Sequence, residues 1–288
     1  MLLTVLQQSP VLLVSLIFIV GLLVGSFLNV VIYRLPVMMQ TNWRQECREY
    51  LQLPAVDEGK VDTLLFPASR CPHCKTTIKA YQNIPVISYL LLGGKCASCA
   101  TRIPKRYPLI EIFTALCSAA IAWRFGYSWA LLFGLLLTWS LIALSFIDID
   151  HQLLPDSITL PMLWLGLGLS LFNIYTDSPT SIIGAIAGYL SLWSVYKLFK
   201  LLTGKEGMGY GDFKLLALLG AWLGWQYLPL IILLSSLVGA VIGISMIIFK
   251  QHDSSKPIPF GPYLAAAGWL ALIWGDALNR LYLNAVGL

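Results

Sequence analysis

Charged side chains are scarce in this sequence. Asp, Glu, Lys and Arg together make up 11% of the 288 residues, whereas soluble domains carry about 25%. Hydrophobic residues make up 58%, and the mean hydropathy is +0.76. This composition excludes a soluble globular protein and predicts that lipid solvates most of the chain.

Two familiar sequence features are also missing. No Lys or Arg precedes the first apolar run, Pro10 to Tyr33, although a secretory signal peptide begins with basic residues and has a shorter apolar core. We therefore interpret this run as a retained membrane helix. The chain also lacks the G-x-G-x-x-G fingerprint of a Rossmann nucleotide-binding fold.

Apolar runs of roughly membrane-spanning length recur along the chain and predict an all-α polytopic membrane protein with about eight transmembrane helices. The sixth run is short, and Gln226-Tyr227-Leu228-Pro229 separates it from the seventh, so the two could form one broken helix or two helices. The expected runs are 10–33, 107–123, 128–147, 158–175, 181–203, 213–225, 228–249 and 259–283.

The distribution of basic residues favours eight helices with the N-terminus outside. In that arrangement the inside loops and their flanking helix ends hold 17 of the 19 Lys and Arg residues, as the positive-inside rule requires. Only Arg124 and Arg280 fall outside. We expect an inner-membrane protein whose N-terminus lies on the outer side of the membrane, and we expect no nucleic-acid partner.

One polar segment divides the chain into three expected domains. Residues 1–33 form the first transmembrane helix, 34–106 a cytoplasmic domain, and 107–288 a seven-helix membrane domain. The middle segment holds eleven basic residues. A domain of this size needs a metal or another cross-link in addition to its small apolar core.

Paired cysteines in the middle segment supply such a cross-link. Cys71-Pro-His-Cys74 and Cys96-Ala-Ser-Cys99 are separated by 21 residues, which is typical of a four-thiolate zinc site. A structural disulfide is not expected in the reducing cytoplasm. Two redox-active dithiols and an iron–sulfur cluster are the alternatives. A closed four-cysteine zinc site is structural, because it leaves no coordination position for chemistry.

Acidic residues gather at two helix ends. Asp148 and Asp150 end the third run, and Asp212 opens the sixth. The third helix runs from outside to inside and the sixth runs back, so Asp148 and Asp212 are expected at similar depth near the cytoplasmic face. Two neighbouring carboxylates that share a proton are the arrangement of an aspartic protease. Spacing alone does not separate Asp148 from Asp150, and either could be a solvated charge at the membrane surface.

Glycines precede the second acidic site, in Gly209-Tyr-Gly211-Asp212. They permit close backbone approach, against which an extended peptide could lie. Lys214 follows two residues later, and we include Gly209, Gly211, Lys214 and Asp150 as candidate supporting residues of the catalytic site. Asp156, after Pro155, has the sequence pattern of a helix cap.

Taken together, the motifs resemble those of the prepilin peptidases, or type IV leader peptidases, over nearly the whole chain. The resemblance rests on the paired cysteines, on the acidic motifs and on five further segments. These segments are Gly25-Ser-Phe-Leu-Asn29 with Arg34-Leu-Pro36, Tyr81-Gln-Asn-Ile-Pro85, Arg106-Tyr-Pro-Leu-Ile-Glu111, Leu154-Pro155-Asp156 and Pro259-Phe-Gly-Pro262.

This resemblance implies an intramembrane aspartic endopeptidase with Asp148 and Asp212 as catalytic residues. It implies prepilin or type II secretion pseudopilin substrates, cut at the cytoplasmic membrane face. Because the four-cysteine segment is present, it also implies N-methylation of the new N-terminal residue with S-adenosylmethionine. Asn29, Arg34 and Glu111 are candidate residues for binding this methyl donor, although each could instead be structural.

Two other functions fit parts of the sequence. A proton- or cation-coupled transporter would also place acidic residues in a membrane, but the chain shows no convincing internal repeat, and its acids gather at one face. A membrane-tethered zinc module that only binds partners would leave both acidic clusters unexplained.

Overall fold

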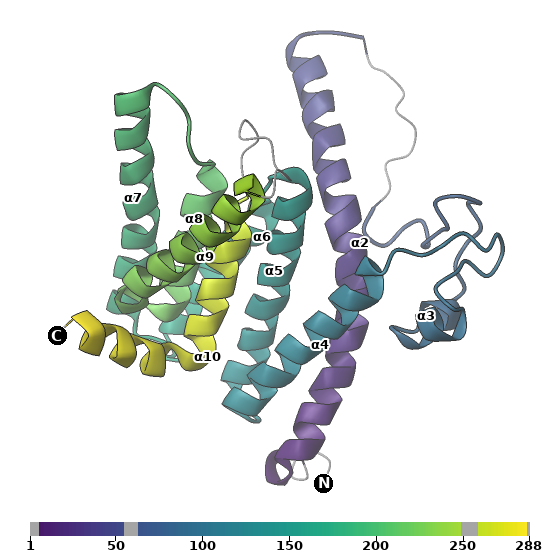
Figure 1. The fold of residues 1–288 in the computed structure, drawn as a ribbon, viewed down its shortest axis with the longest axis horizontal. Helices are drawn as coiled ribbons and strands as arrows, with labels where there is room; N and C mark the ends of the chain where they lie inside the picture. The colour runs from purple at the N-terminus through teal and green to yellow at the C-terminus, as the bar shows by residue number, and fades with distance from the viewer. Residues whose placement is uncertain (1–5, 55–62, 249–258, 287–288) are drawn as a thin grey trace. The chain divides into compact units, whose positions relative to one another are not determined.

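A computed structural model describes residues 6–54, 63–248 and 259–286 (Figure 1). Among these residues the chain is helical, with two isolated β-bridges and no strand, which confirms the all-α class. The long helices are α2 (Pro10–Tyr50), α4 (Arg106–Phe125), α5 (Trp129–His151), α6 (Asp156–Ser170), α7 (Ser178–Thr203), α8 (Tyr210–Leu223), α9 (Leu228–Ile248) and α10 (Gly261–Val286). Three short helices are η1 (Ala80–Asn83), α3 (Ile87–Leu91) and η2 (Trp225–Tyr227).

Each expected apolar run corresponds to one long helix. Length and composition single out five candidate membrane spans among the described residues: α2, α4, α5, α7, and η2 together with α9. Helices α6 and α8 have 15 and 14 residues, or about 22 Å of helix, which is shorter than the hydrocarbon core of about 30 Å. Crossing by α6, α8 and α10 stays a prediction.

The doubtful sixth and seventh runs form two separate helices. Gly224 ends α8 with a φ of 91°, and its N–H donates to the carbonyl of Gly220. The turn η2 follows, and Pro229 lies in the first turn of α9. A positive φ at glycine and a proline in a first turn are ordinary ways to end one helix and start the next.

The first helix is longer than expected. The apolar run ends at Tyr33, but α2 continues without a break to Tyr50 and passes through Pro36. The α-helix therefore extends beyond the expected transmembrane segment. An apolar run indicates which residues contact lipid, whereas a helix continues as long as its backbone hydrogen bonds continue to form. Whether the membrane boundary lies at residue 33 stays a prediction.

The chain divides into two compact units, Met1–Leu131 and Leu132–Leu288. In the first unit α2 packs closely against α4. A Cβ at Gly21 would lie 2.7 Å from the Cα of Ala115, and a Cβ at Gly25 would lie 2.7 Å from the Cα of Glu111. Two glycines four residues apart thus let the helix backbones touch, as small residues do between membrane helices.

In the second unit α8 is the central helix. Its side chains are almost all buried, and it contacts α6, α7 and α10. Figure 1 shows α8 beside α7, and Gly184 and Gly220 face each other so closely that neither could carry a side chain. Ser181 donates from its hydroxyl to the carbonyl of Ala221 at 2.6 Å. These contacts fix the helix that begins with Tyr210-Gly-Asp212.

Candidate active site and metal centre

Asp148 lies in the last turn of α5 with its side chain directed into the second unit. It is 6% exposed, and its neighbour Ile147 is fully buried. Asp150 is exposed, because two residues along an α-helix correspond to a rotation of about 200°. The structure therefore separates the two acids, which sequence spacing could not distinguish.

A backbone N–H holds the Asp148 carboxylate in place. Gly261, the first residue of α10, donates from its amide nitrogen to Asp148 Oδ2 at 3.0 Å. A Cβ at residue 261 would lie 2.7 Å from the same oxygen, so only glycine fits here without a shift. Gly261 belongs to the motif Pro259-Phe-Gly-Pro262, but no sequence pattern marked it as a partner of Asp148.

Asp212 lies in the first turn of α8 and is 7% exposed. Its amide nitrogen donates to the carbonyl of Gly209, the N-cap residue, at 3.3 Å. The N-terminal end of a helix carries a partial positive charge, which favours a carboxylate in the first turn. The glycine motif therefore ends where α8 can accommodate a buried acid.

The two aspartates face a common region of the second unit. Their carboxyl groups are close enough to interact electrostatically. Leu154 packs against Gly211, next to Asp212, and against Gly261, the partner of Asp148. A Cβ added at Gly211 would lie 2.8 Å from the Leu154 Cβ, and one added at Gly261 would lie 3.1 Å from the Leu154 Cδ2. The fold thus brings Asp148 and Asp212, 64 positions apart, into one site.

An ion pair connects the segments that follow the two aspartates. The Lys214 ammonium group donates to both carboxylate oxygens of Asp156, at 2.8 and 2.7 Å. Asp156 is the first residue of α6, whose N-cap is Pro155, so Asp156 is not the helix cap that the sequence pattern suggests. Its side chain instead joins α6 to α8.

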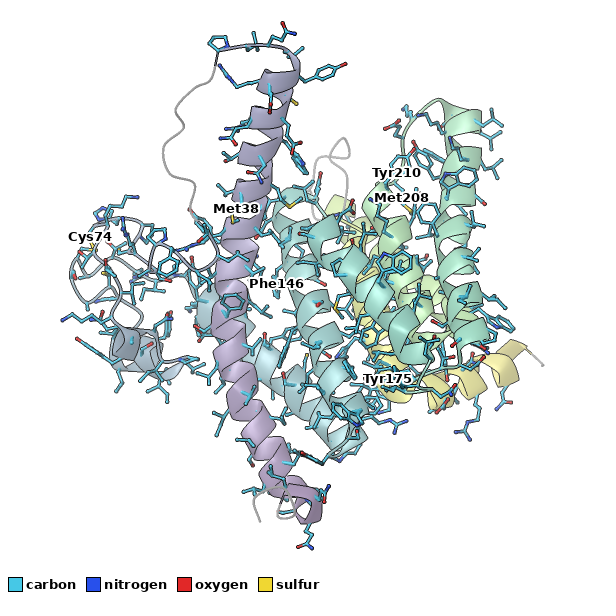
Figure 2. The ribbon with its side chains drawn as sticks, turned by 180° about the vertical axis from the view of Figure 1, so that it is seen from behind. Met38, Cys74, Phe146, Tyr175, Met208 and Tyr210 are labelled. Atoms are coloured by element: carbon cyan, nitrogen blue, oxygen red, sulfur yellow. The ribbon has the colours of Figure 1, made fainter. Side chains whose placement is uncertain are left out.

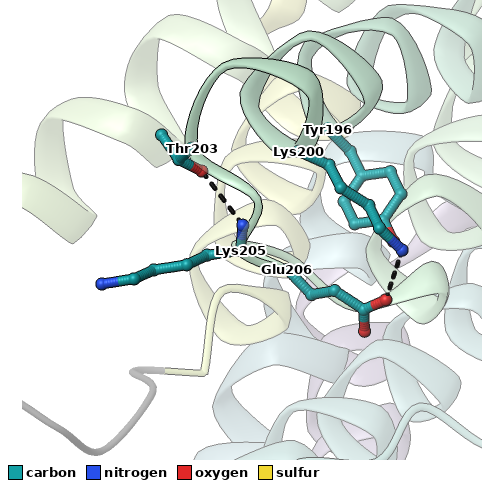
Figure 3. A network of polar contacts seen from close by, with 5 residues as sticks. All are labelled: Tyr196, Lys200, Thr203, Lys205 and Glu206. Atoms are coloured by element: carbon teal, nitrogen blue, oxygen red, sulfur yellow. Dashed lines mark hydrogen bonds and ion pairs between the residues drawn. The ribbon is translucent and has the colours of Figure 1, made fainter.

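A polar network orders the segment that leads into the glycine motif (Figure 3). Lys200 donates to Glu206 Oε1 at 2.6 Å, and the amide nitrogen of Lys205 donates to Thr203 Oγ1 at 3.2 Å. The ring of Tyr196 lies 5.6 Å from the ring of Tyr210, between centroids, and Figure 2 places Tyr210 at the start of α8. Hydrogen bonds to the end of α7 and the contact between the Tyr196 and Tyr210 rings therefore stabilise the turn between α7 and α8.

The four paired cysteines converge in the first unit, and Figure 2 shows Cys74 among its loops. The sulfur atoms of Cys71 and Cys99 are 3.8 Å apart, and those of Cys74 and Cys96 are 3.9 Å apart. A tetrahedral ion with metal–sulfur bonds of about 2.3 Å would set its sulfur atoms about 3.8 Å apart. The four thiols therefore fit a metal ion, and they are too far apart for disulfides.

Both cysteine turns use the same backbone bonds. The amide nitrogen of Lys75 donates to the carbonyl of Cys71, and that of Ala100 donates to Cys96. Hydrogen bonding to Thr76 lowers the pKa of the Cys74 thiol to about 6. A lower pKa favours the thiolate, which is the form that binds metal.

The three candidates for binding a methyl donor each contact the protein's own backbone. The Asn29 amide donates to the carbonyls of Gly25 and Tyr107, both at 3.2 Å. The Arg34 guanidinium donates to the carbonyls of Thr63 and Pro67. The Glu111 carboxylate accepts from the amide of Val86 at 2.8 Å. The three side chains thus join α2, α4 and residues 63–105, which hold the four paired cysteines and which we call the cysteine segment. By these contacts alone the three side chains do not form a binding cradle.

Two family models match this chain. The model described as Bacterial Peptidase A24 N-terminal domain matches residues 19–125, and the model described as Type IV leader peptidase family matches residues 135–244. The first match contains the cysteine segment, and the second contains both aspartates. No solved structure matches the chain.

Several curated proteins named prepilin leader peptidase/N-methyltransferase are similar along their full length. The protein from Stutzerimonas stutzeri is 58% identical over 97% of this chain and 96% of its own length. The protein from Pseudomonas aeruginosa is 56% identical over 99% of both, and that from Neisseria gonorrhoeae is 51% identical over 91% of both. None of these names supports a transporter.

Proposed function

The chain belongs to the type IV leader peptidase family, and we propose that Asp148 and Asp212 are the catalytic pair with which it acts. It is an aspartic endopeptidase that removes a leader peptide and an N-methyltransferase that modifies the new N-terminus. The observation that carries the assignment is the meeting of two buried aspartates, from the end of α5 and the start of α8, in one unit.

The arrangement supports water-mediated peptide hydrolysis. Two carboxyl groups close together share a proton, so one can accept a proton from water while the other donates to the scissile carbonyl. The Gly261 N–H fixes the orientation of Asp148. Packing around α8 fixes Asp212, and neither carboxylate has to reorganise far before reaction.

The substrates are prepilins or type II secretion pseudopilins, as the names of the relatives suggest. Both aspartates lie at helix ends that the basic-residue pattern assigns to the cytoplasmic side. Cleavage then occurs near the membrane surface, at the edge of an apolar substrate segment. Gly209 is exposed and leaves backbone accessible to an extended peptide, and Gly211 lets the chain pack closely against Leu154. Lys214 supports the site through Asp156.

The metal is a structural zinc ion. Four thiolates at tetrahedral spacing suit zinc or an iron–sulfur cluster, and two short CxxC turns around one centre favour zinc. All four positions are occupied by protein ligands, so the ion stabilises the segment and does no chemistry.

The methyl donor is S-adenosylmethionine, which supplies an electrophilic methyl group to the new amine. Asn29, Arg34 and Glu111 are proposed to act at or beside its site. Their backbone contacts connect the cysteine segment to α2 and α4. They would therefore shape the junction where a donor can lie close to the membrane surface.

The protein resides in the bacterial inner membrane with a periplasmic N-terminus and a cytoplasmic catalytic face. The bias of 17 of the 19 basic residues supports this orientation and eight spans. Residues 1–33, 34–106 and 107–288 then serve as first span, cytoplasmic zinc-binding domain and seven-helix protease domain.

The direct test is cleavage of a prepilin peptide by purified full-length protein. Asp148→Asn and Asp212→Asn should each abolish cleavage, because each removes a group that exchanges a proton. Asp150→Asn is the matched control, since Asp150 lies two residues away on the same helix but is exposed. Normal cleavage by Asp148→Asn or by Asp212→Asn would refute the assignment, and so would loss of cleavage only in Asp150→Asn.

A further inference from the structure

An apolar face on the cysteine segment is not covered by any of the residues that the structure describes in the first unit. Ile84, Ile87, Leu90 and Leu91 are 44%, 54%, 70% and 82% exposed. We call these four residues the α3 face. Ile87, Leu90 and Leu91 follow the spacing i, i+3, i+4, which puts them on one side of a helix. Four large aliphatic side chains together are more than the scattered apolar exposure of a soluble surface.

The residues around the α3 face are uncharged. No Asp, Glu, Lys or Arg occurs from residue 80 to residue 94. The opposite side of α3 carries Tyr89, whose hydroxyl donates to the carbonyl of Ile103 at 3.5 Å and whose ring packs at Gly94. One side of α3 is therefore fixed to the cysteine segment, and the apolar side faces away from it.

A hydrogen bond sets the depth of α3 along α4. The amide of Val86, just before α3, donates to Glu111 Oε2 at 2.8 Å. Glu111 lies five residues into α4, or about 7 Å below Arg106 along the helix axis.

The backbone at Val86 is strained where its amide bonds Glu111. Its φ and ψ are 60° and −48°, and the amide of Ile87 bonds the carbonyl of Pro85. This is a γ-turn of the rare kind, and a β-branched residue seldom adopts a positive φ. The turn redirects the chain into α3 and aims the Val86 N–H at Glu111.

Helix α4 leaves little room for α3 to lie in water. It has 20 residues, or about 30 Å of helix, which equals the thickness of the hydrocarbon core. If α4 crosses the membrane, Arg106 must lie at the headgroups and Glu111 near the boundary of the acyl chains. A segment bonded to Glu111 is then at the depth of interfacial helices, about 5–10 Å into the boundary.

Basic side chains flank the uncharged segment. Lys79 precedes it and Lys95 follows it, and a β-bridge places Arg102 opposite Lys95. All three are exposed. An apolar face bordered by exposed Lys and Arg matches a membrane surface that contains anionic phospholipids.

We propose that the α3 face is inserted in the bilayer beside α4, with Lys79, Lys95 and Arg102 at anionic phospholipid headgroups. The occupant of the face is lipid, and neither the substrate nor another protein. The cysteine segment is then a membrane-surface domain held by two anchors, the Glu111 bond and the α3 face. This inference does not depend on the peptidase activity.

Spin-label accessibility in nanodiscs tests the proposal with the full-length protein. A spin-labelled p-acetylphenylalanine is introduced by Leu91→p-acetylphenylalanine or, as the matched control, by Ser98→p-acetylphenylalanine. Ser98 is exposed in the second cysteine turn. Bound metal is measured for both proteins, so that only folded cysteine segments are compared. The label at 91 should be more accessible to oxygen than to a water-soluble nickel chelate, and the label at 98 should show the opposite order.

Two results would overturn the proposal. Preferential access of the nickel chelate to residue 91 would place the α3 face in water. Low access of both reagents would place a protein surface over it. Adding phosphatidylglycerol to phosphatidylcholine nanodiscs should raise the ratio of oxygen to nickel access at residue 91, and an unchanged ratio would refute the role of the basic residues.

Discussion

The buried acidic residues of the two units have different neighbours. In the first unit Glu111 is 8% exposed, and its carboxylate accepts a hydrogen bond from the Val86 amide. In the second unit Asp148 and Asp212 are about as buried but lie close enough to interact electrostatically. Asp148 also accepts a backbone hydrogen bond, from the Gly261 amide, so a backbone donor does not by itself mark a buried carboxylate as structural. What sets Asp148 and Asp212 apart is the second carboxylate nearby, which disfavours ionisation of both groups. Burial alone therefore does not identify a catalytic acid, because its neighbours determine its role.

The two units also differ in the interactions that stabilise them. The cysteine segment has few buried apolar side chains among its described residues, and its four clustered cysteines could hold a metal ion that takes the place of an apolar core. The second unit is held by close helix packing around α8, as at Gly184 and Gly220. Loss of the metal should therefore disturb the first unit locally and leave the second largely intact.

The largest effect should come from the dyad. Asp212→Asn should lower cleavage by about a thousandfold or more, since general acid–base catalysis contributes about 10²–10⁴-fold. The same variant should still methylate a peptide that has already been cleaved. Both rates can be measured in one preparation by mass spectrometry. Loss of both activities together would contradict the functional separation of the two units.

The reverse pattern is expected for the metal centre. Cys71→Ser combined with Cys96→Ser removes two of four ligands and should abolish metal binding, because the remaining pair cannot close a tetrahedron. Methylation should fall more than cleavage. Metal analysis and the same two assays check this, with Cys47→Ser as control, since Cys47 lies outside the four-cysteine cluster. Full metal retention would show that the ligands are misassigned.

A smaller loss is expected at Gly261. The added methyl group of Gly261→Ala would lie 2.7 Å from Asp148 Oδ2 and must displace the carboxylate. Cleavage should fall by about 10- to 100-fold, mainly in kcat, because misplacement of a reacting group by about 1 Å costs about 10²-fold. Gly168→Ala is the control, because a Cβ there meets nothing within 4 Å. Equal activity of the two variants would contradict the role of Gly261.

Glu111 should matter for stability. Glu111→Ala leaves the Val86 amide without its acceptor, at a cost of about 1–3 kcal/mol. Glu111→Gln keeps an oxygen acceptor and should cost less. Thermal unfolding in detergent measures both, beside Glu46→Ala on the exposed part of α2. A loss as large for glutamine as for alanine would argue against the hydrogen bond as the cause.

The smallest effect is expected for Lys214 and Asp156. Their side chains are 29% and 52% exposed, and pairs of this kind contribute about 0–1 kcal/mol. Lys214→Met should reduce cleavage by less than about tenfold. The exchanged double variant Asp156→Lys with Lys214→Asp should recover part of the loss, because it restores attraction between α6 and α8. No recovery would mean that Lys214 acts otherwise than through Asp156.

Sequence patterns predicted much of this protein because membrane and metal constraints are local. Apolar runs located each long helix, since lipid leaves the backbone no partner except its own. The CxxC spacing located the four cysteines that could hold a metal ion, because each turn by itself points two sulfurs at one centre. The true end of α2 was missed, because no apolar signal marks where a helix stops in water.

The pairing that matters most was only half determined by sequence. The sequence by itself predicted that Asp148 and Asp212 lie at helix ends on one side of the membrane, because depth and direction follow from the expected order of membrane spans. Only the tertiary structure distinguished Asp148 from Asp150 and revealed the Gly261 donor. The physical reason is that the direction of a side chain and a contact across 113 residues depend on helix rotation and packing, which no local pattern specifies.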